Sequence, residues 1–195
     1  MRIGVSGPHG TGKTTLVEDL CERLAGHVPV DEPFVLLEEE GYGFEHPPSV
    51  EDYWAQYSRC VRSLCSPAPR VVFDRTPLDF LAYLAALGAD VGAAADPLAL
   101  RSALASLDLL VIVPISHETE RVLPRAELPR LRAAMNDALL DLIHDDPLGV
   151  CRGVRTIELR GPLEGRVAAV IAALPRPGED AKRRGSGESR TRPGA

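Results

Sequence analysis

Lysine is scarce in this 195-residue chain, whose 22 basic residues are 20 arginines and two lysines, Lys13 and Lys182. The chain also lacks any apolar run that approaches the roughly 18–20 residues of a membrane-spanning helix, which excludes an integral membrane protein. Its first residues lead directly into a glycine-rich segment and lack the long apolar region of a secretory signal peptide. We therefore expect a cytoplasmic protein without a membrane partner.

Cysteines are few as well, and they lack the paired CxxC spacing of a zinc site. We expect reduced thiols, as is usual in the cytoplasm. The formal net charge of −6 argues against a nucleic-acid partner, because general nucleic-acid binding requires a basic face. The four cysteines are Cys21, Cys60, Cys65 and Cys151.

Charge divides the chain into two parts. Residues 176–195 contain six basic and three acidic residues, whereas residues 1–175 contain 16 basic and 25 acidic residues, a net charge of −9. The C-terminal part has no large apolar residue and is rich in Gly, Pro, Ser and Arg, so it cannot offset the entropy lost on ordering. We expect one domain over residues 1–174 and a disordered basic tail over residues 175–195.

Segments of strand length alternate with helical segments along the predicted domain. The clearest strand, residues 107–113, is a continuous apolar run, as expected when both faces of a sheet are covered. Such alternation predicts a parallel sheet with helices on both faces, which is a three-layer α/β fold. The predicted strands are residues 2–6, 28–31, 70–74, 107–113 and 154–159. The predicted helical segments are residues 14–25, 49–64 with Ser49 as N-cap, 77–87, 97–106, 117–146 and 162–174, with a flexible connection over 88–97.

Residues 7–14, GPHGTGKT, fit the phosphate-binding pattern GxxxxGK[ST] at every fixed position. The glycines let the backbone curl so that N–H groups surround phosphate oxygens, and the helix that follows adds the positive end of its dipole. Lys13, the only lysine before residue 182, can reach the β- and γ-phosphates, and the Thr14 hydroxyl can ligate Mg²⁺. The motif therefore predicts nucleotide binding. The predicted nucleotide-binding residues are Gly7, His9, Gly10, Thr11, Gly12, Lys13, Thr14 and Thr15.

Acidic side chains follow two of the predicted strands. Asp74 ends the third strand, where ligands of parallel sheets gather, so it can hold Mg²⁺ while Arg75 contacts a phosphate or the acceptor. The alternatives are a helix cap for Asp74 and a surface ion pair for Arg75. Glu32 follows the second strand and is the predicted catalytic base, with Asp31 as its substitute. The alternative for this pair is an ordinary acidic loop.

Arginines recur in the proline-interrupted segment 117–132, after the fourth predicted strand. Their irregular spacing is typical of a mobile lid that closes over transferring phosphates. The alternative is a solvated helix face whose arginines pair with nearby glutamates. We predict that an arginine of this segment acts on the phosphates, with Arg121 and Arg125 as the candidates and Arg130 and Arg132 in the same segment.

In the order of these motifs the chain resembles the nucleoside and nucleotide kinase group of P-loop proteins. It looks like the deoxynucleoside kinases, the thymidylate kinases and the ribosylnicotinamide-kinase-like ATPases, and residues 73–84, FDRTPLDFLAYL, are especially similar to the last group. The resemblance implies a five-stranded parallel sheet of order 2-3-1-4-5, with Mg-ATP as the phosphoryl donor. It also implies an acceptor held between residues 32–65 and the helix after Arg75, with Glu32 matching the catalytic acidic residue of the deoxynucleoside kinases.

Aromatic residues are only 5% of the chain, yet several gather in residues 42–57. They could stack a base or another planar ring, or pack the core of their own helix, and both interpretations stay open. Residues 31–65 carry only two arginines, fewer than a phosphorylated acceptor normally demands. We therefore favour an uncharged or cationic acceptor, such as a nucleoside, a ribosylated base or an amino sugar. The predicted acceptor residues are Asp31, Tyr42, Trp54, Tyr57 and Asp79.

Three functions fit this sequence. The first is a kinase in which Glu32 takes a hydroxyl proton from a small-molecule acceptor while Lys13 neutralises the γ-phosphoryl group. The second is a regulatory P-loop ATPase or switch, and the third is a nucleotide-binding scaffold without catalysis. A nucleoside monophosphate kinase is an alternative form of the first. A homodimer and the choice between ATP and GTP stay open.

Overall fold

The computed structural model describes residues 1–122 and 127–175 of the chain. The predicted lid residue Arg125 and the predicted tail beyond residue 175 lie outside these residues. Within the described ranges, no helix is both long enough and apolar enough to cross a membrane. Strands and helices alternate there as the sequence predicts.

One sheet is formed by five parallel strands, β1 (Arg2–Ser6), β2 (Val28–Val30), β3 (Val71–Asp74), β4 (Leu109–Ile112) and β5 (Thr156–Glu158). Their order, β2-β3-β1-β4-β5, confirms the predicted order. Val5 of the central strand pairs with Asp74 of β3, and Ser6 pairs with Ile112 of β4. The P-loop follows β1 directly, so it lies at the carboxyl edge of the sheet with Asp74 beside it.

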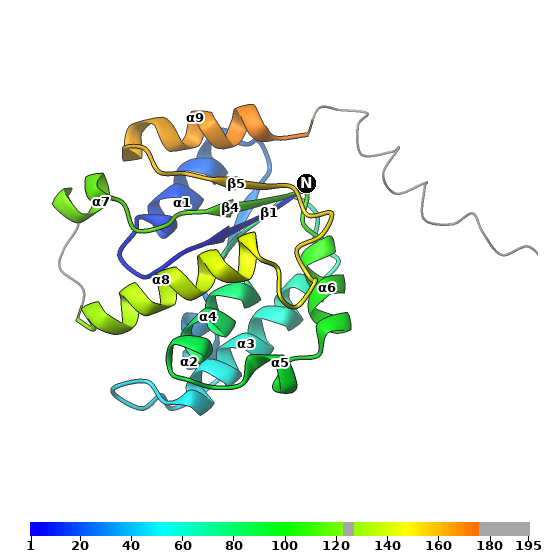
Figure 1. Ribbon diagram of the computed structural model, residues 1–195. Coiled ribbons are helices and arrows are strands. Elements are labelled where there is room, and N and C mark those ends of the chain that lie inside the picture. Colours follow the sequence, from blue (N-terminus) through cyan, green and yellow to red (C-terminus); the bar gives the residue numbers. More distant parts are fainter. Residues whose placement is uncertain (123–126, 176–195) are drawn as a thin grey trace, which may run out of the picture.

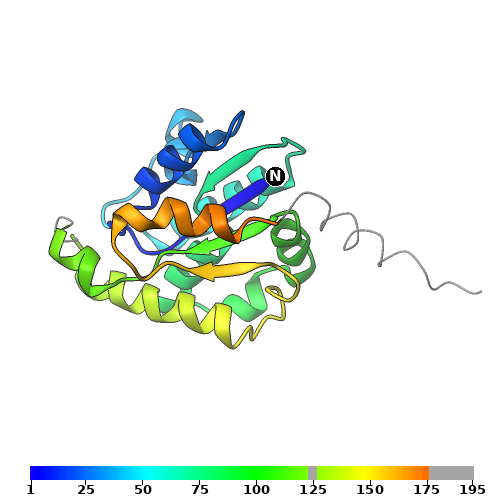
Figure 2. The ribbon, with the colours of Figure 1, turned by 90° about the horizontal axis from the view of Figure 1, so that it is seen from above.

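Helices cover both faces of this sheet, which confirms the three-layer architecture (Figures 1 and 2). Helices α1 and α9 pack together on one face, and on the other face α4 packs against both α3 and α8. The described residues form α1 (Lys13–Arg23), α2 (Pro33–Glu39), α3 (Val50–Cys65), α4 (Pro77–Ala86), α5 (Val91–Ala94), α6 (Pro97–Ala105), α7 (His117–Val122), α8 (Pro129–His144) and α9 (Leu163–Ala173).

The alternating side chains of β4 divide the core into two clusters. Leu109 and Val111 pack with residues of α1 and α9, whereas Leu110 and Ile112 pack with residues of α3, α4, α6 and α8. All four side chains are buried. This confirms the predicted reason for the continuous apolar run of β4, because helices cover both faces of the strand.

The helix boundaries follow local signals, with two additions to the predicted elements. Ser49 caps α3 as predicted, through a capping box with Asp52. An acidic loop is the alternative that the sequence leaves open for Asp31 and Glu32, whereas the structure has α2 directly after Glu32, with Pro33 in its first turn. The connection predicted as flexible over residues 88–97 contains the short helix α5.

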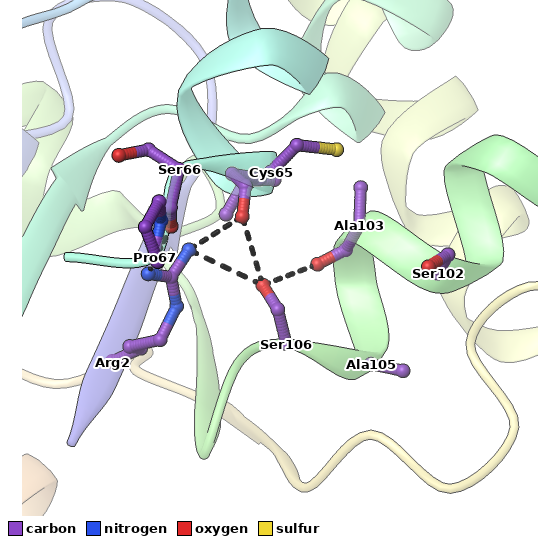
Figure 3. A pocket seen from close by; sticks show the side chains of 9 residues that line it. Arg2, Cys65, Ser66, Pro67, Ser102, Ala103, Ala105 and Ser106 are labelled. Carbon is purple, nitrogen blue, oxygen red and sulfur yellow. Dashed lines mark hydrogen bonds between the residues drawn. The ribbon is translucent and has the colours of Figure 1, made fainter. Parts of the chain in front are cut away.

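Arg2, at the start of β1, binds backbone carbonyls at the end of the sheet where the parallel strands begin (Figure 3). Its guanidinium donates to the carbonyls of Leu64 (2.5 Å), Ser66 (2.8 Å) and Ala68 (2.6 Å), at and just beyond the end of α3. The hydroxyl of Ser106, after α6, also donates to the Leu64 carbonyl. These bonds satisfy carbonyls that a helix end leaves without intrahelical partners. The cavity of about 400 Å³ beside them lies at the edge opposite the P-loop and is not part of the candidate site.

Candidate active site

The P-loop, residues 7–14, packs closely against the end of β4. Gly7 has a φ of 150°, and a Cβ atom there would lie 2.2 Å from the carbonyl oxygen of Val113. Gly12 has a φ of 80° and is the N-cap of α1. Both positions therefore require glycine, one for close backbone approach and one for a left-handed conformation.

Lys13 lies inside the curl of the loop, where only 5% of the residue is exposed. Its ammonium group donates to the carbonyl of Pro8 at 2.8 Å. Burial, together with the positive charge of Arg75, lowers the pKa of Lys13 to about 8. Phosphate oxygens would supply the negative charge that this buried ammonium group lacks.

Asp74 and Thr14 bring two oxygen donors together beside the P-loop. The Thr14 hydroxyl donates to Oδ2 of Asp74 at 2.6 Å, while Oδ1 of Asp74 is buried and has no hydrogen-bond partner among the described residues. Burial raises the pKa of Asp74, although nearby Lys13 partly offsets the effect. A carboxylate and a hydroxyl are hard oxygen ligands that suit Mg²⁺, which usually binds through one or two protein groups plus substrate phosphates.

These two residues therefore fit Mg²⁺. The described residues contain no cluster of three or more His, Cys, Asp or Glu side chains that could hold a metal ion by themselves. A magnesium site at Asp74 would depend on the nucleotide for further ligands, as it does in P-loop enzymes.

Arg75 links the predicted base to the P-loop. Its Nε donates to Oε2 of Glu32 at 2.5 Å, and its Nη1 donates to the carbonyl of Gly7 at 3.3 Å. Burial alone would raise the pKa of Glu32, but the charge and hydrogen bond of Arg75 outweigh it and lower that pKa. Glu32 is therefore held as an oriented carboxylate. Arg75 does form an ion pair, as the alternative interpretation of this residue had it, but the pair lies within the candidate site and Arg75 is buried.

Asp79, predicted to contact the acceptor, lies beneath the P-loop instead. It is fully buried, its Oδ1 accepts from the Gly7 N–H at 2.8 Å, and its Oδ2 accepts from the Thr76 N–H at 2.9 Å. Arg75 Nη1 lies 3.5 Å from Oδ1. Both carboxylate oxygens are engaged within the protein, so the observed role of Asp79 is to join the start of α4 to the phosphate loop.

A cavity of about 170 Å³ adjoins the ion pair of Glu32 and Arg75. The sequence predicted these two residues for catalysis but did not identify the others that surround the cavity. One signal was present, because Tyr53 and Gln56 share the buried face of α3 with Leu64 and have helical spacing. The lining consists of Glu32, Phe34, Pro48, Tyr53, Gln56, Arg75, Phe80 and Tyr83.

None of the predicted acceptor residues lines this cavity. Trp54 packs edge-on against Tyr57, with ring centroids 5.3 Å apart, and both contribute to the core beside α4. The Tyr42 hydroxyl donates to Asp52 at 3.1 Å. Asp31 is exposed. For Trp54 and Tyr57, the structure thus matches the interpretation that aromatic residues of this helix pack its own core.

His9 joins the P-loop to the wall of the cavity. Its Nδ1 lies 2.9 Å from the hydroxyl of Tyr83, and the Tyr83 ring stacks on Tyr53 with centroids 4.7 Å apart. Burial, with the charges of Arg75 and Arg132, lowers the pKa of His9 to about 4. A neutral imidazole therefore connects the phosphate loop to two aromatic rings of the cavity.

The arginines of the predicted lid are in different environments. Arg121 is exposed on α7, and Arg130 is exposed in the first turn of α8. Arg132 is buried, pairs with Glu120 of α7 at 2.8 Å, and donates through Nε to the carbonyl of His9 at 2.7 Å. Among the described residues of the predicted lid, Arg132 thus contacts the P-loop directly, whereas Arg121 and Arg125 were the predicted candidates.

Thr14 and Thr15 are exposed in the first turn of α1, where a phosphate group can reach them. Thr11 is buried, and its hydroxyl donates to the carbonyl of Pro8 at 2.9 Å. Gly10 is exposed with a φ of 65°. The predicted nucleotide-binding residues therefore lie together in one loop and the start of the helix that follows it.

Comparisons with known proteins agree with this geometry. The family model described as an AAA domain matches residues 2–166 of the chain. No curated protein sequence matches this chain. Among solved structures, deoxyadenosine kinase from M. mycoides with bound dATP has a TM-score of 0.58 and 12% sequence identity, covering 88% of this chain and 98% of that one.

Two further structures are similar. NadR protein in complex with NR has a TM-score of 0.60 and 23% identity, covering 88% of this chain and 49% of that one. Shikimate kinase from Aquifex aeolicus has a TM-score of 0.52 and 16% identity, covering 96% and 99% of the two chains. Identities this low show a shared fold and leave the substrate open. The chain therefore belongs to the AAA domain family of P-loop proteins, and its fold is that of small-molecule kinases.

Proposed function

We propose that this protein is an ATP-dependent kinase that transfers the γ-phosphoryl group to a hydroxyl of a small uncharged or cationic metabolite. The observation that carries the proposal is the cavity beside Glu32 and Arg75. Glu32 lines this cavity and is linked to the phosphate loop through Arg75, which supports a second substrate bound there beside the phosphates. A P-loop alone binds nucleotide, but a kinase also needs such a space.

The lining of the cavity supports a flat, uncharged acceptor. Four of its side chains are aromatic, namely Phe34, Tyr53, Phe80 and Tyr83. The cavity volume of about 170 Å³ is below the roughly 300 Å³ at which typical ligand pockets begin, which favours a small acceptor. The buried amide of Gln56 supplies both a donor and an acceptor for the edge of a ring.

The charges of the lining argue against a phosphorylated acceptor. Glu32 and Arg75 are its charged residues, and they pair with each other. A second phosphate would need further guanidinium or ammonium groups. A nucleoside-like compound therefore fits the proposal better than a nucleoside monophosphate.

In the proposed reaction, the acceptor oxygen forms a bond to the γ-phosphorus while the bond from that phosphorus to the bridging β–γ oxygen breaks. ADP leaves, and the hydroxyl proton passes to the carboxylate of Glu32. Arg75 orients this carboxylate, and Lys13 stabilises negative charge on the phosphates. Mg²⁺, held through Asp74 and Thr14, would neutralise charge on the phosphate oxygens when bound.

The test is a screen of the full-length protein with Mg-ATP against nucleosides, ribosylated bases and amino sugars, with products identified by mass spectrometry. We expect a product 80 mass units heavier than one acceptor, the mass of an added phosphoryl group on the general chemistry of kinases. Lys13→Ala should lower its rate by about 10²-fold or more.

A different result would favour the regulatory ATPase. In that case ATP hydrolysis would proceed at the same rate with every compound of the screen and would produce only ADP and inorganic phosphate. Phosphorylation of nucleoside monophosphates but not of nucleosides would also overturn the proposed acceptor class. Glu39→Gln is a suitable control, because this exposed carboxylate lies on α2 near Glu32 but does not line the cavity.

A further inference from the structure

The carbonyl groups in the first part of the P-loop, residues 7–12, are all hydrogen-bonded within the protein. The carbonyls of Pro8 and Gly12 are bound by donors of the loop and the helix that follows it. Lys13 and the Thr11 hydroxyl donate to Pro8, and the Leu16 N–H donates to Gly12 at 3.1 Å. The remaining carbonyls are bound by arginine side chains that come from other elements.

Three arginines bind the carbonyls of residues 7, 9, 10 and 11. We call this group the arginine collar, which consists of Arg75 after β3, Arg132 of α8 and Arg166 of α9. Arg75 donates to the carbonyl of residue 7, as described above. Arg132 donates to those of residue 9 at 2.7 Å and residue 10 at 3.3 Å, and Arg166 Nη1 donates to that of residue 11 at 2.7 Å.

The arginines of the collar are buried, and burying a charged guanidinium group costs free energy that its hydrogen bonds to the loop must offset. Arg132 and Arg166 are only 6% and 2% exposed. Burial lowers the pKa of Arg166, and its Nη2 has no hydrogen-bond partner in the described part of the chain. A buried donor without a partner costs about 1–3 kcal/mol. The hydrogen bond of Arg166 to the loop therefore forms although burial of this side chain is energetically unfavourable.

The geometry gives these arginines a role in the conformation of the loop. A peptide group has its carbonyl and its N–H on opposite sides, so fixing the carbonyls outward directs neighbouring N–H groups toward the inside of the curl. That inner face is where a P-loop binds the β- and γ-phosphates. Arg132 also pairs with Glu120, so its planar guanidinium serves three acceptors at once.

We propose that Arg132 and Arg166 are positioning residues that hold the phosphate loop in its binding conformation without touching the nucleotide. This inference rests on nucleotide binding by the P-loop, but it does not depend on which acceptor is phosphorylated. Arg166 is the more distinctive member, because it comes from the last helix of the domain and belongs to no motif recognised in the sequence.

The experiment measures the affinity of the full-length protein for MgATP, MgADP and AMP by isothermal titration calorimetry. Arg132→Lys and Arg166→Lys keep the charge but remove the planar fork, and Arg132→Gln and Arg166→Gln serve if a lysine variant fails to fold. We expect each variant to bind MgATP and MgADP about tenfold more weakly, the effect of losing one charge-assisted hydrogen bond. AMP has no β-phosphate for the loop and should lose less than about threefold.

Arg101→Lys is the matched control. Arg101 also donates to a backbone carbonyl, that of Gly149 at 2.7 Å, but far from the P-loop. Its nucleotide affinities should equal those of the unmodified protein, and circular dichroism should show every compared variant to be folded. If the screen for acceptors fails, these binding experiments still decide the inference.

Three results would overturn the inference. Unchanged affinity for MgADP in both arginine variants would show that the loop does not need them. A loss confined to MgATP would show contact with the γ-phosphate in place of positioning. An equal loss for AMP would place the effect at the nucleoside part of the ligand.

Discussion

At the scale of single residues, Arg75 joins most parts of the candidate site. Its φ of 80° is unusual for a residue with a side chain and costs of order 1–3 kcal/mol. Its N–H donates to the carbonyl of Val5 at 2.9 Å, and its carbonyl accepts from the Cys60 thiol. Its guanidinium binds Glu32, Asp79 and the P-loop. These contacts together hold the strained backbone and direct the side chain to the junction of the loop and the cavity.

Lys13 gives a prediction about pH. In the free protein its pKa is lowered to about 8, and bound phosphates would raise that pKa because they carry the opposite charge. Nucleotide affinity should therefore be fully present below pH 8 and fall as pH rises above it, approaching tenfold per pH unit, with proton uptake on binding. Calorimetric titration with MgADP at pH 8.5, in two buffers of different ionisation enthalpy, measures this uptake.

The same titration at pH 6.5 is the control for Lys13, since the lysine is then protonated before and after binding. His9 cannot account for uptake at pH 8.5, because its pKa is lowered to about 4. Identical binding enthalpies in the two buffers at pH 8.5 would contradict the assigned environment of Lys13.

Two glycines of the P-loop should differ in their tolerance of substitution. Gly7→Ala combines a positive φ with a 2.2 Å approach to the Val113 carbonyl, so we expect a loss of about 3–5 kcal/mol in the free energy of unfolding. Gly10 also has a positive φ, but a Cβ atom there would meet nothing within 4 Å. Gly10→Ala should cost only about 1–2 kcal/mol. Urea denaturation measures both values, and equal losses would contradict the close packing of Gly7.

At the scale of elements, the start of α4 supports the phosphate loop. Thr76 is the N-cap of this helix, and its N–H donates to Asp79 at 2.9 Å. The Thr76 hydroxyl lies 2.7 Å from the hydroxyl of Ser6 at the end of β1. Because Asp79 also accepts from the Gly7 N–H, one carboxylate fixes both the helix and the loop. The local geometry of α4 therefore affects nucleotide binding without direct contact.

Asp79→Asn tests this support. The amide keeps one acceptor oxygen but directs an NH₂ group toward a backbone N–H, so we expect a loss of about 3 kcal/mol in unfolding free energy. The comparison is Asp96→Asn at the exposed N-cap of α6, where asparagine caps about as well and the change should stay within about 0.5 kcal/mol. Chemical denaturation of both variants decides it. Similar small losses would indicate that Asp79 is not essential to the loop.

The sequence predicts elements well where the signal is local. The glycine positions, the capping box at Ser49 and the apolar run of β4 depend on neighbours in the chain, and the structure confirms each of them. Helix α2 is not among the predicted helices, because its glutamates are also typical of an acidic loop, although Pro33 is a helix-start residue. The cavity lining was only partly identified, because it joins residues from segments that only the tertiary fold brings together.

The same limit applied to the arginines. The spacing of the arginines in residues 117–132 predicts a lid, but it does not distinguish a buried arginine from an exposed one. Spacing along the chain carries no information on contacts across the fold. Arg132 and Arg166 lie 123 and 155 residues from the carbonyls they bind. Only tertiary structure brings these side chains to the P-loop.

At the scale of the whole molecule, the candidate site receives side chains from both faces of the sheet. The cavity beside Glu32 and Arg75 belongs to the face covered by α3 and α4, whereas Arg166 reaches the loop from α9 on the opposite face. Arg132 reaches it from α8, whose residues pack with α4. Nucleotide bound at the loop would therefore contact a point where both faces of the domain meet.

This arrangement predicts that nucleotide stabilises the entire domain. At a concentration 100 times its dissociation constant, MgADP should add about 2.7 kcal/mol to the free energy of unfolding and raise Tm by about 5–10 °C. Differential scanning calorimetry measures the shift. Lys13→Ala should shift little under the same conditions, and an equal shift in that variant would contradict binding at the P-loop.

The central claim is that Glu32 acts as the base for an acceptor in the adjoining cavity. The most direct test compares transfer of radiolabelled γ-phosphoryl from ATP to the acceptor found in the screen, for the unmodified protein, Glu32→Gln and Glu39→Gln. We predict that Glu32→Gln lowers the transfer rate by about 10²–10⁴-fold, while MgADP affinity stays unchanged and Glu39→Gln behaves like the unmodified protein. Transfer by Glu32→Gln at the unmodified rate would contradict the account.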